Sequence, residues 1–144
     1  LKQPTLKRNK KMQGQAFIDG GARGNPGPAG AGGLVKGDKP LTICEYLGHQ
    51  TNNYAEYQGL ILTIKKALTN GYQELDIFCD SELVVKQIKG LYKVKNEALK
   101  TLYIEAQKYL QQLKQYTITH IRREYNKEAD TLVNKAIDDG LKRN

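Results

Sequence analysis

The hydrophobic pattern of the chain begins with the short period of β-strands. Residues 15–19 form a compact apolar run that ends in an acid, and they predict a short buried strand. The glycine- and proline-rich stretch 20–33 predicts a turn and a second strand, continued by residues 34–35, that another backbone can approach closely. A hairpin turn at residues 37–38 leads to a third strand over residues 42–48. Three strands joined by short turns predict an antiparallel meander.

The pattern then changes to the period of a helix. Apolar residues recur at helical spacing from 53 to 70, and Gly71 is typical of a helix end. Residues 74–80 predict a fourth strand, which is compact and apolar. Ser81 is a good N-cap for a second helix, which we expect to run through Lys89.

The last third of the chain continues the alternation of helices and strands. Asn96 can cap a third helix with an apolar stripe that reaches Leu113. Residues 116–122 alternate as a fifth strand, and residues 127–139 predict a terminal helix that Gly140 ends. The order βββαβααβα predicts an α/β fold with a five-stranded mixed sheet flanked by helices. In that sheet, an antiparallel meander of three strands is joined by two parallel strands.

Length and charge predict one domain behind a basic leader. Residues 1–13 are polar, carry five basic residues and no acid, and lack periodicity. We therefore expect a disordered leader or linker remnant, followed by a domain over residues 14–141. The net charge is +8, from 23 basic and 15 acidic residues, and it falls to +3 (18 against 15) without the leader, so it says little about a polyanionic partner. A local run of lysines is more specific: Lys86, Lys89, Lys93, Lys95 and Lys100.

Two further features bear on where the protein works. Cys44 and Cys79 lie inside apolar runs without metal-ligand spacing, and they predict two buried thiols in a reducing compartment. No apolar run approaches the ~20 residues of a membrane span, so we expect no membrane partner. These features together predict a cytoplasmic protein.

Four acidic residues fall at the ends of predicted elements. Asp19 ends the first strand and Asp80 the fourth, whereas Glu56 and Asp130 lie in the first turns of helices. Taken singly, these acids have structural explanations. Asp80 could cap the next helix, and Glu56 and Asp130 could each interact favourably with the positive end of a helix dipole. If they met, they would suit a metal centre, because neighbouring carboxylates repel unless a cation lies among them, and hard oxygen ligands suit Mg²⁺ or Mn²⁺, but the spacing alone does not show that they converge. Four carboxylates around two such ions are typical of displacement at phosphorus.

Four motifs in register resemble the type 1 ribonuclease H family. They are IDGGARGNPGPAG at residues 18–30, TNNYAE at 51–56, CDS at 79–81 and NKEADTL at 126–132. The resemblance covers about residues 14–140, and the family fold agrees with the order of elements predicted above. Only five residues separate Gly90 from Asn96, so the chain resembles a short form of the family that lacks the inserted basic handle.

The resemblance implies an activity and its metal ligands. The activity would be an endonuclease that hydrolyses the RNA strand of RNA–DNA hybrids by two-metal-ion catalysis and leaves 5′-phosphate and 3′-hydroxyl ends. The cofactor would be two Mg²⁺ ions, with Mn²⁺ able to substitute, and the enzyme would act as a monomer. The catalytic and metal-binding residues would be Asp19, Glu56, Asp80 and Asp130. Asp19 would bridge both ions, Asp130 would hold the one that activates water, and Glu56 and Asp80 would hold the other.

Substrate contacts follow from the same resemblance. A hybrid cutter must contact successive 2′-hydroxyls, and a glycine-rich loop can bring backbone groups close to them. Thr51 with Asn25 resembles a pocket that grips a phosphate of the DNA strand. The residues expected to contact the substrate are Gly20, Gly21, Ala22, Arg23, Gly24, Asn25, Thr51, Asn52, Asn53, Lys95 and Asn96.

Histidines depart from the family pattern. Many relatives carry a histidine on a mobile loop before the last helix, but here that loop is reduced to about residues 123–125. Glu124 is the candidate that could replace it as a further catalytic residue. His120 lies inside the alternating strand and is interpreted as structural, and His49 is interpreted as a surface residue.

Three alternatives stay open at the level of sequence. The domain could belong to a larger polyprotein such as a reverse transcriptase. It could bind hybrid or duplex RNA without cutting it. The same acids could also serve a member of the wider nuclease superfamily that acts on DNA–DNA duplexes.

Overall fold

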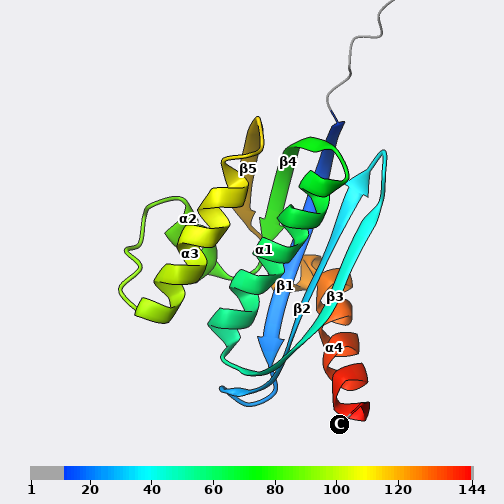
Figure 1. The fold of residues 1–144 in the computed structure, drawn as a ribbon, viewed down its shortest axis with the longest axis vertical. Coiled ribbons are helices and arrows are strands. Elements are labelled where there is room, and N and C mark those ends of the chain that lie inside the picture. Colours follow the sequence, from blue (N-terminus) through cyan, green and yellow to red (C-terminus); the bar gives the residue numbers. More distant parts are fainter. Residues whose placement is uncertain (1–11, 144) are drawn as a thin grey trace, which may run out of the picture.

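The computed structural model describes residues 12–143. Of the predicted leader, residues 1–11 lie outside the described residues, and residues 12 and 13 begin the first strand. The elements follow the predicted order, with a short 3-10 helix added before the last helix (Figure 1). They are β1 (Met12–Ala22), β2 (Gly27–Gly37), β3 (Leu41–Gln50), α1 (Asn52–Thr69), β4 (Tyr72–Cys79), α2 (Glu82–Ile88), α3 (Glu97–Leu110), β5 (Gln115–His120), η1 (Arg123–Tyr125) and α4 (Lys127–Lys142).

The five strands form one mixed sheet in the order β3-β2-β1-β4-β5. Strands β1, β2 and β3 pair antiparallel, whereas β4 pairs parallel with both β1 and β5. The predicted fold class is therefore confirmed. Ile18 pairs with Cys79 across β1 and β4, so the residues that follow them, Asp19 and Asp80, lie side by side where β4 ends.

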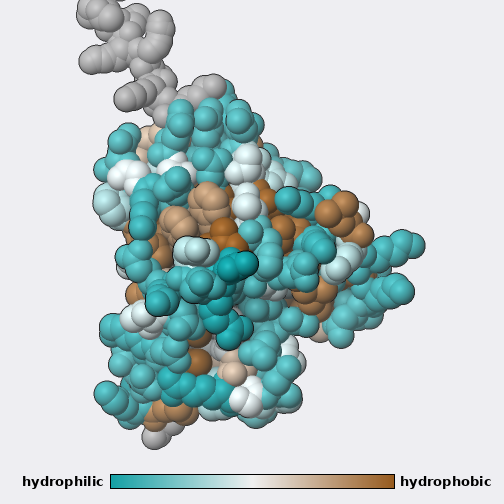
Figure 2. Space-filling view, turned by 180° about the vertical axis from the view of Figure 1, so that it is seen from behind, coloured by the Kyte–Doolittle hydropathy of each residue, from teal (hydrophilic) through white to brown (hydrophobic). Residues whose placement is uncertain are grey.

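Helices cover the two faces of the sheet unequally (Figure 1). On one face, α1 packs against β1, β2 and β3, and α3 packs on α1. On the other face, α4 packs against β2 and β3 and contacts β1 less. The face seen in Figure 2 is mainly hydrophilic around an apolar area. The core lies between the sheet and α1 and includes Ala16, Ile18, Tyr57, Leu60, Ile64, Ile77 and Leu110. Among the described residues, no helix has the length and apolar character needed to span a membrane.

Two glycines bring β1 and α1 unusually close. A Cβ at Gly20 would collide with the carbonyl oxygen of Ala55, and a Cβ at Gly59 would collide with the carbonyl oxygen of Asp19. Only residues without a side chain allow the helix backbone to lie against the end of this strand. The contact places the start of α1 directly beside Asp19.

Side-chain caps fix where the helices begin. The hydroxyl of Ser81 accepts from the N–H of Val84 at 3.2 Å, and the side-chain oxygen of Asn96 accepts from the N–H of Leu99 at 3.0 Å. Both predicted caps are confirmed, which leaves Asp80 free of capping duty.

One prediction about a helix end and one about a buried cysteine were wrong. Gly140 does not end the last helix, because α4 continues through Lys142. A Cβ at Gly140 would collide with the ring of Tyr46, so this glycine permits close packing of α4 on β3. Cys44 is exposed rather than buried, since it lies on the edge strand β3, whereas Cys79 is buried as predicted.

Candidate active site

The four predicted carboxylates come from four elements and line one cavity of about 540 Å³. Asp19 lies near the end of β1, and Asp80 directly follows β4. Asp130 lies in the first turn of α4, as predicted. Glu56 lies beyond the first turn of α1, which contains no acid, so the prediction that placed it there was wrong and a helix dipole does not explain it.

Burial and the charges of neighbouring acids raise the pKa values of three carboxyls in the cavity, those of Asp19, Glu56 and Asp80. Asp19 is 8% exposed, and burial, followed by the charges of Asp80, Asp130 and Glu56, raises its pKa to about 8 despite a hydrogen bond from the Gly20 N–H. Burial also raises the pKa of Glu56 to about 7, although a hydrogen bond with Ser81 opposes the rise. The pKa of Asp80 is raised mainly by burial as well. Ionising the whole set is therefore unfavourable without added positive charge.

The donor set fits a hard divalent cation. The lining supplies carboxylate and amide oxygens, and the described residues that form it include no His or Cys. Carboxyls with pKa values raised by burial and by one another are the groups that a cation stabilises most. Within residues 12–143, no group of three or more His, Cys, Asp or Glu side chains is arranged closely enough to hold a metal ion. The fit therefore rests on the chemistry of the donors and on the cavity they share.

Asn126 ties two strand ends together beneath the carboxylates. Its side chain is 2% exposed, and its amide donates to the carbonyl oxygen of Ile18 at 2.8 Å and to Oδ2 of Asp80 at 3.4 Å. The second bond lowers the pKa of Asp80 and opposes the effect of burial. Asn126 therefore holds the Asp80 carboxylate against the end of β1.

Arg123 is a site residue that sequence reasoning missed. Its side chain lines the cavity, and its positive charge lowers the pKa values of Glu56 and Asp80. No signal in the sequence identified it, because its place beside the acids depends on how the connection between β5 and α4 folds. Glu124 instead lines a separate hollow of about 250 Å³ with Phe17 and Lys36.

The two histidines differ in their relation to the site. His120 is the last residue of β5 and is exposed, and its charge lowers the pKa of Asp80 slightly. It lies within β5, as predicted, and pairs with Cys79 where β4 ends beside the site. His49 is exposed on β3, as predicted.

The residues expected to contact substrate divide between two hollows. The carboxylate cavity is lined by Gly20, Gly21, Ala22, Arg23, Asn25, Asn52 and Asn53. A neighbouring hollow of about 390 Å³ is lined by Asn25 and Asn53 together with Thr51 and Asn96. Neither lining includes Gly24, which has a φ of 90° in the turn, or Lys95, which is exposed between α2 and α3.

Two asparagines connect the glycine-rich turn to α1. The Asn52 side chain accepts from the N–H of Ala22 at 2.8 Å, and the Asn25 side chain accepts from the N–H of Asn52 at 3.0 Å. The turn between β1 and β2 is therefore fastened to the start of α1, which holds both hollows in a fixed relation.

Known proteins are similar to this chain over most of its length. The family model described as reverse transcriptase-like matches residues 17–136. Ribonuclease HI of Halobacterium salinarum is 38% identical over 127 residues, which are 86% of this chain and 64% of that protein. A bifunctional protein of Mycobacterium tuberculosis is 42% identical over 124 residues, which are 83% of this chain and 34% of that protein. The chain thus spans less than two thirds of the length of these relatives.

Solved structures share the fold as well. The N-terminal ribonuclease H domain of the Mycobacterium tuberculosis protein, fused to maltose-binding protein, has a TM-score of 0.83 at 39% identity, covering 87% of this chain and 98% of that one. LC11-RNase H1 in complex with an RNA/DNA hybrid has a TM-score of 0.79 at 37% identity, covering 91% of this chain and 99% of that one.

Proposed function

The chain belongs to the type 1 ribonuclease H family, and from this premise we propose that it is an endonuclease that hydrolyses the RNA strand of RNA–DNA hybrids. The observation that carries the proposal is the meeting of Asp19, Glu56, Asp80 and Asp130 in one cavity. A similar protein, LC11-RNase H1, has been solved in complex with an RNA/DNA hybrid, which supports the choice of substrate. We assign the activity to the domain of residues 14–141, acting as a monomer in the cytoplasm.

The four carboxylates would hold two Mg²⁺ ions, with Mn²⁺ able to substitute. Asp19 would help to hold both ions, Asp130 would help to hold the ion that activates the attacking water, and Glu56 and Asp80 would help to hold the other. Such ions supply charge stabilisation at phosphorus and lower the pKa of the attacking water. We expect products with 5′-phosphate and 3′-hydroxyl ends.

The other residues of the cavity orient groups and balance charge. Asn126 holds the Asp80 carboxylate through its amide, 3.4 Å away. Arg123 supplies a positive charge within the cavity, where it stabilises the ionised forms of Glu56 and Asp80. We assign to Arg123 the further task of attracting the scissile phosphate, because a guanidinium is a strong phosphate donor and remains charged at any relevant pH.

The two hollows would grip the two strands of the hybrid. The turn beside the carboxylates, with its small residues, would contact the RNA strand, whose 2′-hydroxyls distinguish it from DNA. The neighbouring hollow, with Thr51, Asn25 and Asn96, would bind a phosphate of the DNA strand. Lys95 would add positive charge beside that hollow.

A strand-labelled hybrid tests this function. We expect cleavage of the RNA strand with Mg²⁺ or Mn²⁺, no cleavage with EDTA, and loss of cleavage in the Asp19→Asn variant. Hybrid that is bound but left intact would point instead to a binding module. Equal cleavage of a DNA–DNA duplex would point to another branch of the nuclease superfamily, so both duplexes belong in the same assay.

A further inference from the structure

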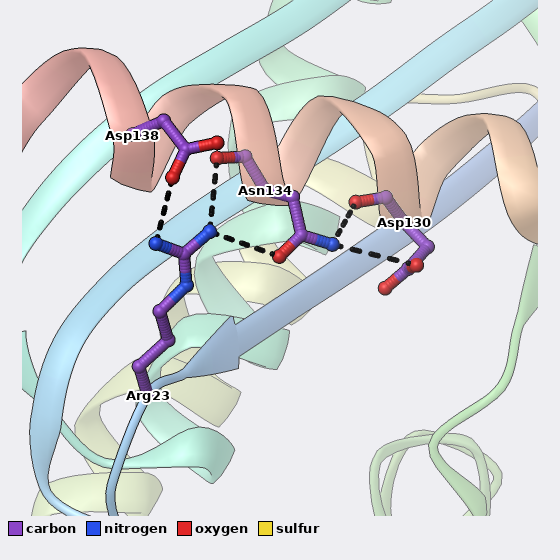
Figure 3. Close-up of polar contacts among 4 residues, drawn as sticks. All are labelled: Arg23, Asp130, Asn134 and Asp138. Atoms are coloured by element: carbon purple, nitrogen blue, oxygen red, sulfur yellow. Dashed lines mark hydrogen bonds and ion pairs between the residues drawn. The ribbon is translucent and has the colours of Figure 1, made fainter.

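Helix α4 carries three polar residues along one face, beside the candidate active site. Asp130, Asn134 and Asp138 are spaced four residues apart and therefore lie on one face of the helix (Figure 3). Arg23 reaches this face from the turn between β1 and β2. Its guanidinium is thus directed at α4, although the sequence led us to expect it to face the substrate.

A chain of hydrogen bonds connects Arg23 to the Asp130 carboxylate. Nη1 of Arg23 donates to Oδ1 of Asp138 at 2.7 Å, and Nη2 donates to Oδ1 of Asn134 at 3.2 Å and to its carbonyl oxygen at 3.4 Å. The side-chain nitrogen of Asn134 donates in turn to Asp130, at 3.1 Å to the carbonyl oxygen and at 3.5 Å to Oδ2. The amide of Asn134 therefore lies between a guanidinium and a carboxylate (Figure 3).

This placement fixes which way the Asn134 amide points. An asparagine amide has one accepting oxygen and one donating nitrogen, whereas a guanidinium only donates and an ionised carboxylate only accepts. With Arg23 on one side, the oxygen must face Arg23 and the nitrogen must face Asp130. The reversed amide would set donor against donor and acceptor against acceptor, so Arg23 determines the group that Asp130 meets.

We propose that Asn134 is a positioning residue for the Asp130 carboxylate, and that Arg23 acts through Asn134 rather than by contacting the substrate. The inference rests on the proposed function only in that Asp130 is assigned to the metal centre. It couples the glycine-rich turn to the carboxylate of Asp130. A displacement of the turn would move Arg23, and the amide of Asn134 could then rotate away from Asp130.

Mn²⁺ binding without substrate tests the positioning role directly. Asn134→Leu keeps the size of the side chain and removes both polar ends, and we expect it to raise the Mn²⁺ dissociation constant about 10-fold, the low end for partners that hold a metal ligand. The exposed position of Asn134 and the 3.5 Å contact both favour the low end. Free Mn²⁺ measured by electron paramagnetic resonance gives the constant. Thr131→Val is the matched control, since it also removes one side-chain bond to the helix backbone and should leave Mn²⁺ binding unchanged.

A double-mutant cycle tests the role of Arg23. We expect Arg23→Leu to weaken Mn²⁺ binding less than Asn134→Leu does, and to add nothing when combined with it. In cleavage assays both variants should need more Mn²⁺ while the KM for the hybrid stays constant. Unchanged Mn²⁺ binding in Asn134→Leu would overturn the inference, and so would an Arg23→Leu effect that persists in the double variant or appears in the KM. Because binding is measured without substrate, the result holds even if the proposed cleavage activity fails.

Discussion

Asp19 is the residue on which the other acids of the cavity act most strongly. Its carboxyl is almost fully buried at the end of the central strand, and the charges of Asp80, Asp130 and Glu56 all raise its pKa. A fold gains no stability from ionised carboxylates gathered in this way. The arrangement is therefore explained by a function that needs the negative charge, and the cost should be measurable in the metal-free protein.

The stability of the metal-free protein should fall as the pH rises from about 4 to about 8. Folded Asp19 keeps its proton up to about pH 8, whereas in the unfolded chain it has the ordinary pKa of 3.8, so the folded state binds more protons between these values. The free energy of unfolding then decreases with pH in that window, and Glu56 adds a change of the same sign up to about pH 7. Asp19→Asn should reduce the fall by at least about 1 kcal/mol, since one unit of pKa equals about 1.4 kcal/mol.

Urea unfolding in EDTA, at about pH 5 and about pH 8, measures this difference. Equal pH dependence in the wild type and in Asp19→Asn would mean that the carboxyl ionises normally in the folded state. Saturating Mg²⁺ should restore stability at the higher pH, because a ligand that binds only the folded state stabilises it.

Asp80→Asn should nearly abolish cleavage and leave the fold intact. Asparagine has the same shape as aspartate and no charge, so it relieves the repulsion but removes one ligand, and we expect a loss of at least about 100-fold in kcat. The matched control is Asp76→Asn on β4, the strand that Asp80 follows, where the carboxylate is exposed and accepts from the Thr117 hydroxyl at 2.7 Å. Cleavage rates and melting temperatures check both variants. Similar rates in the two variants would contradict the assignment of Asp80.

At the scale of elements, the contact between β1 and α1 holds two of the acids in place. Gly59 lies in the middle of α1 against the carbonyl oxygen of Asp19, and Gly20 lies against the helix backbone. The carboxylates of Asp19 and Glu56 can share a cavity because these two backbones approach so closely. The geometry of the site thus depends on glycines that carry no chemistry themselves.

Gly59→Ala should destabilise the protein although alanine favours helices. The helical preference for alanine is worth about 1 kcal/mol, but the added Cβ collides with the Asp19 backbone, and overpacking of this kind costs about 1–3 kcal/mol. We expect a net loss of stability and, because Asp19 is displaced, about a 10-fold loss of kcat. Gly140→Ala collides with Tyr46 instead and should lose stability while it keeps the rate. Unfolding and cleavage, measured on both variants, separate the two effects.

Local signals predicted the elements well, and long-range packing explains the exceptions. The caps at Ser81 and Asn96 depend on a few neighbouring residues, which is why both were confirmed. Gly140 resembles a helix end in the sequence, yet it serves a contact with Tyr46 that lies 94 residues away in the chain (140 − 46). Sequence periodicity contains no information on such a contact.

The same distinction applies to the site as a whole. The four acids could be named from motifs, but their convergence depends on the strand order, which places β4 directly beside β1 in the sheet. The orientations of the Arg123 and Arg23 side chains could not be predicted, because each depends on groups from another element. Arg123 lines the cavity with the acids, and Arg23 donates hydrogen bonds to α4. The double-mutant cycle with Asn134 tests the role of Arg23.

On the scale of the whole molecule, exposed lysines before and at the start of α3 flank in sequence the residues Asn96, Ala98 and Leu99, which line the hollow that contains Thr51. Lys86 is engaged with Glu82 at 3.0 Å and with the Tyr92 ring, and Lys89 lines a separate hollow beside β5, so Lys93, Lys95 and Lys100 are the candidates for contacts with phosphates.

Changing Lys93, Lys95 and Lys100 together to Gln should weaken hybrid binding and flatten its salt dependence. Each lysine–phosphate contact contributes about 1 to the slope of log K against log salt, so the slope should fall by up to about 3. The comparison is made in an Asp80→Asn background, where the hybrid stays intact, by fluorescence anisotropy over a range of salt. The control changes Lys65, Lys108 and Lys114 to Gln, which removes the same charge from exposed positions toward the other ends of α1 and α3. An equal change of slope in both triple variants would mean that net charge, rather than the position of the lysines, attracts the hybrid.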